Sequence, residues 1–160
     1  QQARANEAER IETGQGYRLH VYGGVLHRVP ADWRFPRCGV LDMWRQWWIG
    51  DSVRHIHPLR LLKIEDVQHL DRIPLDETEQ HGRNGRFGNQ RRAVKRTLCD
   101  LRFLMNWIAN KVETAGAKEE VITLSSVNRM FEAVAHLFSE AERDGQKSWL
   151  TVVRAVRTRG

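Results

Sequence analysis

The chain has 160 residues and a pI near 9.9, with 26 lysines and arginines against 20 acidic residues. This length suits one domain with a sizeable core or two small domains, and two cysteines cannot form the disulfide framework of a small secreted protein. No apolar run approaches the length of a membrane span, and no signal-peptide pattern opens the chain. Because the chain begins at Gln1 without an initiator methionine, we expect it to be part of a longer protein. The two cysteines are expected to be reduced thiols in an intracellular protein.

The N-terminal region divides into a polar lead-in and a β-hairpin. Residues 1–15 contain one large apolar residue, Ile11, so we expect a lead-in segment with little order, followed by a single mainly helical domain over 16–160. Residues 17–29 form two β-favouring runs on either side of Gly23-Gly24. Paired glycines suit the positive φ angles of a tight turn, which predicts a hairpin over 17–29.

The tryptophan-rich stretch that follows predicts a helix over 39–49. At 100° per residue, one face of this helix carries the apolar residues Val40, Trp44, Trp47 and Trp48. Gly50 is suited to end the helix, because glycine adopts the left-handed conformation without a Cβ penalty. Large aromatic side chains dominate core energetics, so we expect these tryptophans to form the nucleus of the core.

Short elements and a polar connection separate this helix from the next one. We expect a loop over 51–58, a buried turn over 59–62 and a short helix over 64–70. Residues 71–90 contain a proline, three glycines and many polar residues. This composition predicts a long, mobile connection.

The longest helix is predicted over 89–112. Its apolar residues recur at spacings of three and four, in the order Val94, Leu98, Leu101, Met105, Ile108 and Val112. This spacing places them on one side of a helix, and the run is too short for a coiled coil, so it favours the core of a bundle.

Two further amphipathic segments complete the chain. A helix is predicted over 125–143, capped by Ser125 or Ser126 and ended by Gly145. Residues 148–157 predict a short helix, with a strand as the alternative because several of these residues are β-branched. The expected fold class is therefore mainly α, a bundle of three or more helices with a small N-terminal β-hairpin.

The sequence contains no catalytic or metal-binding signature. Its histidines include His55 and His57, and its cysteines are Cys38 and Cys99, but no Cys-x-x-Cys or His-x3-His pair has the spacing of a structural zinc site. The serine-hydrolase, zinc-protease and phosphate-loop motifs do not occur either. We therefore expect no metal, no cofactor and no enzymatic activity.

Positive charge is concentrated in two blocks that contain no acid. Residues 82–99 hold six bases and residues 145–160 hold four. On a helical projection of 89–112, the bases lie opposite the apolar stripe, with Asp100 as the single acid beside them. The candidate nucleic-acid-binding residues are Arg83, Arg86, Arg91, Arg92, Lys95, Arg96 and Arg102. Arginine suits phosphates and guanine edges in the major groove, whereas the alternative is an ordinary solvated face.

Residues 38–110 resemble a known family in the order of their motifs. The quoted residues are Val40-x3-Trp44-x2-Trp47-x2-Gly50, with Asp42 and Met43 before the first tryptophan, then Pro58, the 64–70 segment and Arg91-Arg92. This order is similar to the start of the DNA-binding domain of fungal transcriptional activators of glycolytic genes, although Gln46 stands where that family has an acidic residue. The resemblance implies that the tryptophans are core residues and that Arg91 and Arg92 contact DNA.

These features together predict a DNA-binding domain of a transcription regulator or of a protein derived from a mobile element. We expect it to act in the nucleus and to contact double-stranded DNA through the basic helix. The alternative is a protein-interaction module whose basic surface binds an acidic protein partner. The two differ in salt dependence, because a phosphate-binding surface loses affinity for duplex DNA steeply as salt rises.

Overall fold

The computed structural model describes residues 17–72 and 86–159, with side chains over 17–70 and 94–159. Its elements in chain order are β1 (His20–Tyr22), β2 (Val25–His27), α2 (Val40–Trp48), η1 (Leu59–Leu61), α3 (Ile64–Val67), η2 (Gln68–Arg72), α5 (Arg86–Thr114), α6 (Leu124–Glu132), η3 (Ala135–Leu137), α7 (Glu140–Asp144) and α8 (Trp149–Arg157), where η marks a 3-10 helix. The expected fold class is confirmed, since helices dominate and the small hairpin is N-terminal. The lead-in over 1–15 lies outside the described residues.

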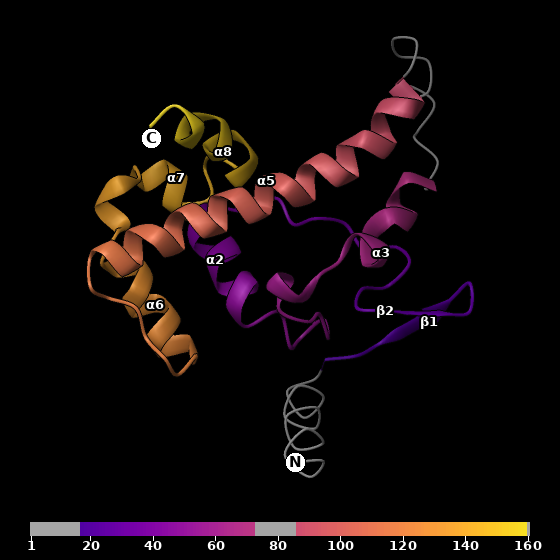
Figure 1. The fold of residues 1–160 in the computed structure, drawn as a ribbon, viewed down its shortest axis with the longest axis horizontal. Coiled ribbons are helices and arrows are strands. Elements are labelled where there is room, and N and C mark those ends of the chain that lie inside the picture. The colour runs from indigo at the N-terminus through magenta and orange to yellow at the C-terminus, as the bar shows by residue number, and fades with distance from the viewer. Residues whose placement is uncertain (1–16, 73–85, 160) are drawn as a thin grey trace.

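Helix α5 runs across the whole molecule, and the other elements are arranged along it (Figure 1). Helix α8 and η2 pack against it, as do α3 and, near its C-terminal end, α6. The predicted apolar stripe is buried from Val94 to Val112. This single helix is therefore the support on which the remaining elements assemble.

The long connection expected over 71–90 is wrong at both ends. The 3-10 helix η2 continues to Arg72, and α5 already begins at Arg86, so that only 73–85 lies outside the described residues. Gly88 falls inside α5 rather than in a linker. One glycine in a helix costs about 1 kcal/mol relative to alanine, which a helix of this length tolerates.

The tryptophan helix α2 lies at the centre of the core, as predicted. It packs against α6, α7, α8 and η1. Val40, Met43 and Trp44 are fully buried and Trp47 nearly so, whereas Trp48 is only half-buried. The indole Nε1 of Trp44 donates a hydrogen bond of 2.9 Å to the carbonyl oxygen of Val127, which joins α2 to α6.

The single helix predicted over 125–143 is wrong, because the chain forms three shorter elements there. Helix α6 ends at Glu132, η3 follows, and Phe138 is extended with φ −124° and ψ 146°. A new helix, α7, then begins after Ser139. The Ser139 amide donates to the Glu142 carboxylate at 2.9 Å and the Glu142 amide donates to the Ser139 hydroxyl at 3.2 Å, a capping box that starts α7.

The ends of these C-terminal helices follow the expected chemistry with one change. The N-cap of α6 is Thr123 rather than Ser125 or Ser126, and Ser126 supplies the other half of its capping box. Gly145 ends α7 with a φ of +98°, as predicted. Residues 149–157 are helical rather than extended, which settles the alternative left by the sequence.

The predicted hairpin is confirmed, and it is attached to α3. Strands β1 and β2 are antiparallel, with Val21 opposite Leu26, and both turn glycines have positive φ. The buried carboxylate of Asp66 accepts hydrogen bonds from the backbone amides of Arg28, at 3.0 Å, and Lys63, at 2.9 Å. A lone hairpin is marginally stable in water, so this attachment supplies the support that it needs.

Candidate nucleic-acid interface

The outward side of α5 carries no exposed acid between Lys95 and Val112. The exposed side chains along this stretch are Lys95, Arg96, Cys99, Arg102, Asn106 and Asn110. Each is a base, an amide or a thiol, because the apolar residues of the helix are turned into the core. The predicted cationic face is thus present on the surface over the part of α5 whose side chains are described.

Arg102 links this face to the turn before α3. Its Nη2 donates a hydrogen bond of 2.9 Å to the carbonyl oxygen of Leu62, and the side chain is otherwise exposed. The next residue, Lys63, is also exposed. One guanidinium N–H group of Arg102 is therefore engaged in the fold, and the residue after its acceptor is an exposed lysine that sequence reasoning did not assign.

The single acid on this side of α5 is neutralised from α8. Asp100 accepts a hydrogen bond of 2.6 Å from the guanidinium of Arg157, which also lies 4.3 Å from the ring centroid of Phe103. The side chains of Asp100 and Arg157 are 24% and 47% exposed. Because the pair is partly exposed it adds little to stability, but it neutralises the negative charge at the edge of the cationic face.

Helix α8 runs in the same direction as α5 and brings a second arginine to this edge. Leu150 near its start lines a pocket together with Val94 and Thr97 of α5, whereas Arg157 near its end meets Asp100. Arg154 is exposed and lies on the same side of α8 as Leu150 and Arg157, at spacings of four and three. The two acid-free blocks of the sequence are thus adjacent in space. We call the combined surface the cationic band, formed by Lys63, Lys95, Arg96, Arg102 and Arg154, with the Asp100–Arg157 ion pair joining its α5 and α8 parts.

The predicted binding residues divide into three groups. Lys95, Arg96 and Arg102 are exposed on α5. Arg86, Arg91 and Arg92 lie within the α5 backbone, but their side chains are outside the described set, and Arg83 lies outside the described residues altogether. Placing Arg86 in a linker was wrong, since it is the first residue of α5.

The end of the second basic block has a structural role instead. Arg159 donates a hydrogen bond of 2.8 Å to the carboxylate of Glu142, which is buried beneath it. Burial alone would raise the pKa of Glu142, but the Ser139 amide and the Arg159 guanidinium outweigh that effect and hold the pKa below its ordinary value of 4.5. Arg159 is therefore committed to holding α7 and is left out of the cationic band.

The described histidines and cysteines form no metal-binding cluster. Within 17–72 and 86–159 no group of three or more histidine, cysteine or acidic side chains is placed to hold a metal ion. His57 Nε2 lies 3.0 Å from the Arg18 carbonyl oxygen, which fixes the ring in the fold. Burial, with a smaller contribution from the nearby Asp42 carboxylate, raises the pKa of the Cys38 thiol to about 11, so this thiol stays protonated and weakly nucleophilic.

No protein-family model, curated protein or solved structure matches this chain. The resemblance to fungal activators therefore depends only on the residues quoted for it. Of these, Trp44 and Trp47 are buried as the resemblance implies, while DNA contact by Arg91 and Arg92 stays a prediction. Among the described helices, none combines the length and the apolar character that crossing a membrane requires.

Proposed function

We propose that this protein is the DNA-binding domain of a transcription regulator or of a protein derived from a mobile element, acting in the nucleus. The cationic band is the proposed contact surface. One observation carries the proposal: the exposed side of α5 has no unpaired acid from Lys95 to Val112, because Arg157 of α8 neutralises Asp100. Like charges along one helix face repel by a few tenths of a kcal/mol per pair, so folding alone gives no reason to collect them there.

The shape of α5 supports contact with a duplex. Its 29 residues correspond to about 43 Å at 1.5 Å per residue, and its first turns extend past α8 (Figure 1). The major groove admits one α-helix, and two helices side by side are too wide for it. We therefore infer that the N-terminal half of α5 enters the groove with Lys95 and Arg96 at its phosphate edges, while Lys63 and Arg154 contact phosphates that flank it.

Contact with phosphate can be tested by removing the charge of individual residues and measuring the affinity for duplex DNA. A cation that meets phosphate contributes to affinity for every duplex sequence, because it releases condensed counterions. Lys95 and Arg96 are exposed on the outward side of α5, and neither takes part in an ion pair within the described part of the chain. Removing the charge at these two positions should therefore test binding with little effect on folding.

The test is a pair of double variants in duplex-binding titrations over a range of salt. Lys95→Ala with Arg96→Ala should weaken binding and flatten the slope of log affinity against log salt by roughly 1.8, the value for two phosphates on B-DNA. The control is Arg54→Ala with Lys118→Ala, which removes the same charge at exposed positions outside the cationic band. Both double variants should keep the parental melting temperature within about 2 °C.

Two results would overturn the proposal. If the α5 double variant and the control lose the same affinity, the protein attracts DNA only through its net charge. If the parent chain binds no duplex even at low salt, the basic surface does not serve DNA and an acidic protein becomes the favoured partner. A random-duplex selection with the parent chain then identifies the preferred sequence, if binding is specific.

A further inference from the structure

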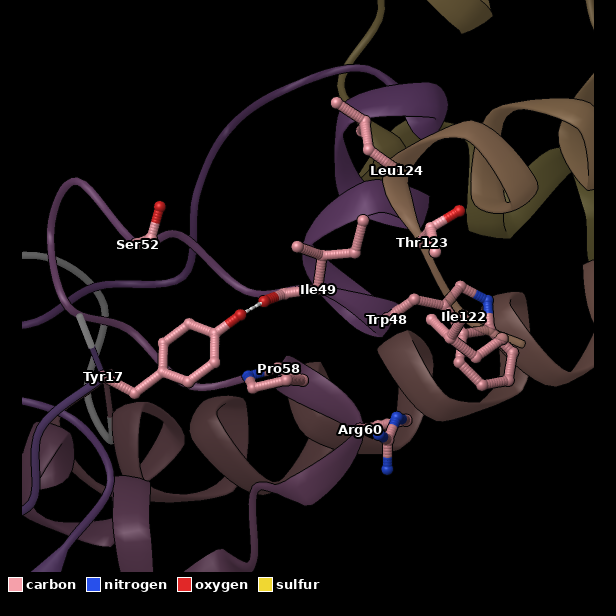
Figure 2. A pocket seen from close by; sticks show the side chains of 9 residues that line it. All are labelled: Tyr17, Trp48, Ile49, Ser52, Pro58, Arg60, Ile122, Thr123 and Leu124. Carbon is pink, nitrogen blue, oxygen red and sulfur yellow. Dashed lines mark hydrogen bonds between the residues drawn. The ribbon is translucent and has the colours of Figure 1, made fainter. Parts of the chain in front are cut away.

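An open pocket of about 520 Å³ lies between the end of α2, η1 and the segment that leads into α6 (Figure 2). This volume is within the range of clefts that bind small molecules and side chains, about 300–1,000 Å³. Trp48 and Ile122 form part of its wall, with Leu124 further along, and Tyr17 lines the opposite end. The Tyr17 hydroxyl donates to the carbonyl oxygen of Ile49, which holds that end in place.

Exposed apolar side chains occur in the pocket wall and at two positions next to lining residues in the sequence. Leu124, in the wall, is 56% exposed; Val121, which precedes Ile122, is 72% exposed; and Val53, which follows the lining residue Ser52, is 86% exposed. The other large hydrophobic side chains exposed on the described surface belong to the hairpin region, Leu19, Val21, Val25 and Leu26. Clustered exposed apolar side chains mark interaction sites more often than singly scattered ones.

Arg60 places one unbalanced charge at the edge of these apolar walls. It is the sole charged residue among those that line the pocket, and its guanidinium lies over the Trp48 ring, 5.7 Å from the centroid. Within the described part of the chain it has no carboxylate partner. A guanidinium stacked on an aromatic ring still presents its N–H edge to a carboxylate. The chemistry of the pocket therefore matches a ligand with bulky apolar groups beside one acid.

We propose that this pocket binds a segment of another protein in which an acidic residue lies between bulky apolar residues. The apolar side chains occupy the space between Trp48, Ile122 and Leu124, and the carboxylate pairs with Arg60. Trp48 offers a reporter, because its indole N–H is buried at this wall and has no acceptor among the described residues. This assignment uses none of the cationic band and is independent of the proposed DNA binding.

The test uses three capped peptides and the folded full chain. The probe is acetyl-Ser-Phe-Asp-Leu-Ser-amide, with Asn in place of Asp in the second peptide and Ala in place of both apolar residues in the third. Heteronuclear NMR follows the Trp48 indole N–H, assigned by its loss in Trp48→Phe. We expect the first peptide to shift this signal with a Kd below about 1 mM, and the other two to bind at least about tenfold more weakly.

Matched variants distinguish binding in the pocket from nonspecific electrostatic and hydrophobic binding. Arg60→Gln should bring the Asp and Asn peptides to equal affinity, whereas Arg54→Gln should not. Leu124→Ser should weaken binding of the Asp peptide, whereas Leu19→Ser, at a similarly exposed position on the hairpin side, should not. The proposal is overturned if the parent shows no shift up to about 5 mM peptide, or if the Asn peptide binds as well as the Asp peptide. It is also overturned if Arg60→Gln weakens duplex binding while leaving the Asp peptide unaffected, because Arg60 would then serve nucleic acid.

Discussion

Replacing Trp44 by alanine tests the packing on which the fold depends. The indole is fully buried, its ring meets Trp48 edge to face at 5.6 Å between centroids, and its Nε1 donates to the Val127 carbonyl at 2.9 Å. The substitution removes a large apolar side chain from a closed site and leaves a cavity. Changes of this kind cost about 3–5 kcal/mol.

This cost is large enough to be measured in two ways. In a chain of this size each kcal/mol shifts the melting temperature by about 2–4 °C, so Trp44→Ala should lower it by roughly 6–20 °C, as followed by circular dichroism. Trp44→Phe keeps most of the ring and loses the hydrogen bond, and should cost roughly 1–3 kcal/mol in urea titrations. A change within 1 °C for Trp44→Ala, with the same urea dependence, would refute the burial of this ring and with it the placement of α2 in the core.

Three other predictions address backbone contact, pH and metal. Gly39→Ala should cost about 1–3 kcal/mol in urea unfolding, because a Cβ at this position would lie 2.4 Å from the backbone nitrogen of Gly145. The carboxylate of Glu142 stabilises the fold above its ordinary pKa of 4.5 and loses that effect as pH falls through its lowered folded pKa. Glu142→Gln should therefore reduce the unfolding free energy at pH 7, and the deficit should shrink in urea titrations below pH 4.5. Treatment with a chelator should leave the melting temperature unchanged, and elemental analysis should find no stoichiometric zinc.

Periodicity predicted the two central helices well because burial acts on one side of each. The stripe from Val94 to Val112 and the tryptophans of α2 repeat at helical spacing, and both are core in the structure. The same reasoning failed over 125–143, where apolar residues continue across a break at Phe138. The signal for the break was present in the sequence, because Ser139 followed by Glu142 is a capping-box pattern. Apolar spacing alone cannot show where one helix stops and another starts on the same core.

The candidate interface was predictable only in part, because its completion depends on contacts between distant residues. The cationic face of α5 follows from a helical projection. The pairing of Asp100 with Arg157, 57 residues apart, depends on how α8 lies against α5. Lys63 joins the surface because Arg102 bonds to the carbonyl of Leu62, 40 residues away. Neither contact has a local pattern in the sequence.

Through the ion pair with Asp100, Arg157 in the last turn of α8 supplies the counterion for an acidic residue of the central helix α5. Arg157→Ala would keep every base that the α5 sequence supplies, yet it would leave the Asp100 carboxylate unneutralised one turn from Arg96. Weakened duplex binding by this variant would arise either from the negative charge unmasked on the helix or from the loss of the Arg157 cation itself. Adding Asp100→Asn to Arg157→Ala separates the two explanations, because it restores binding only if the unmasked charge is the cause.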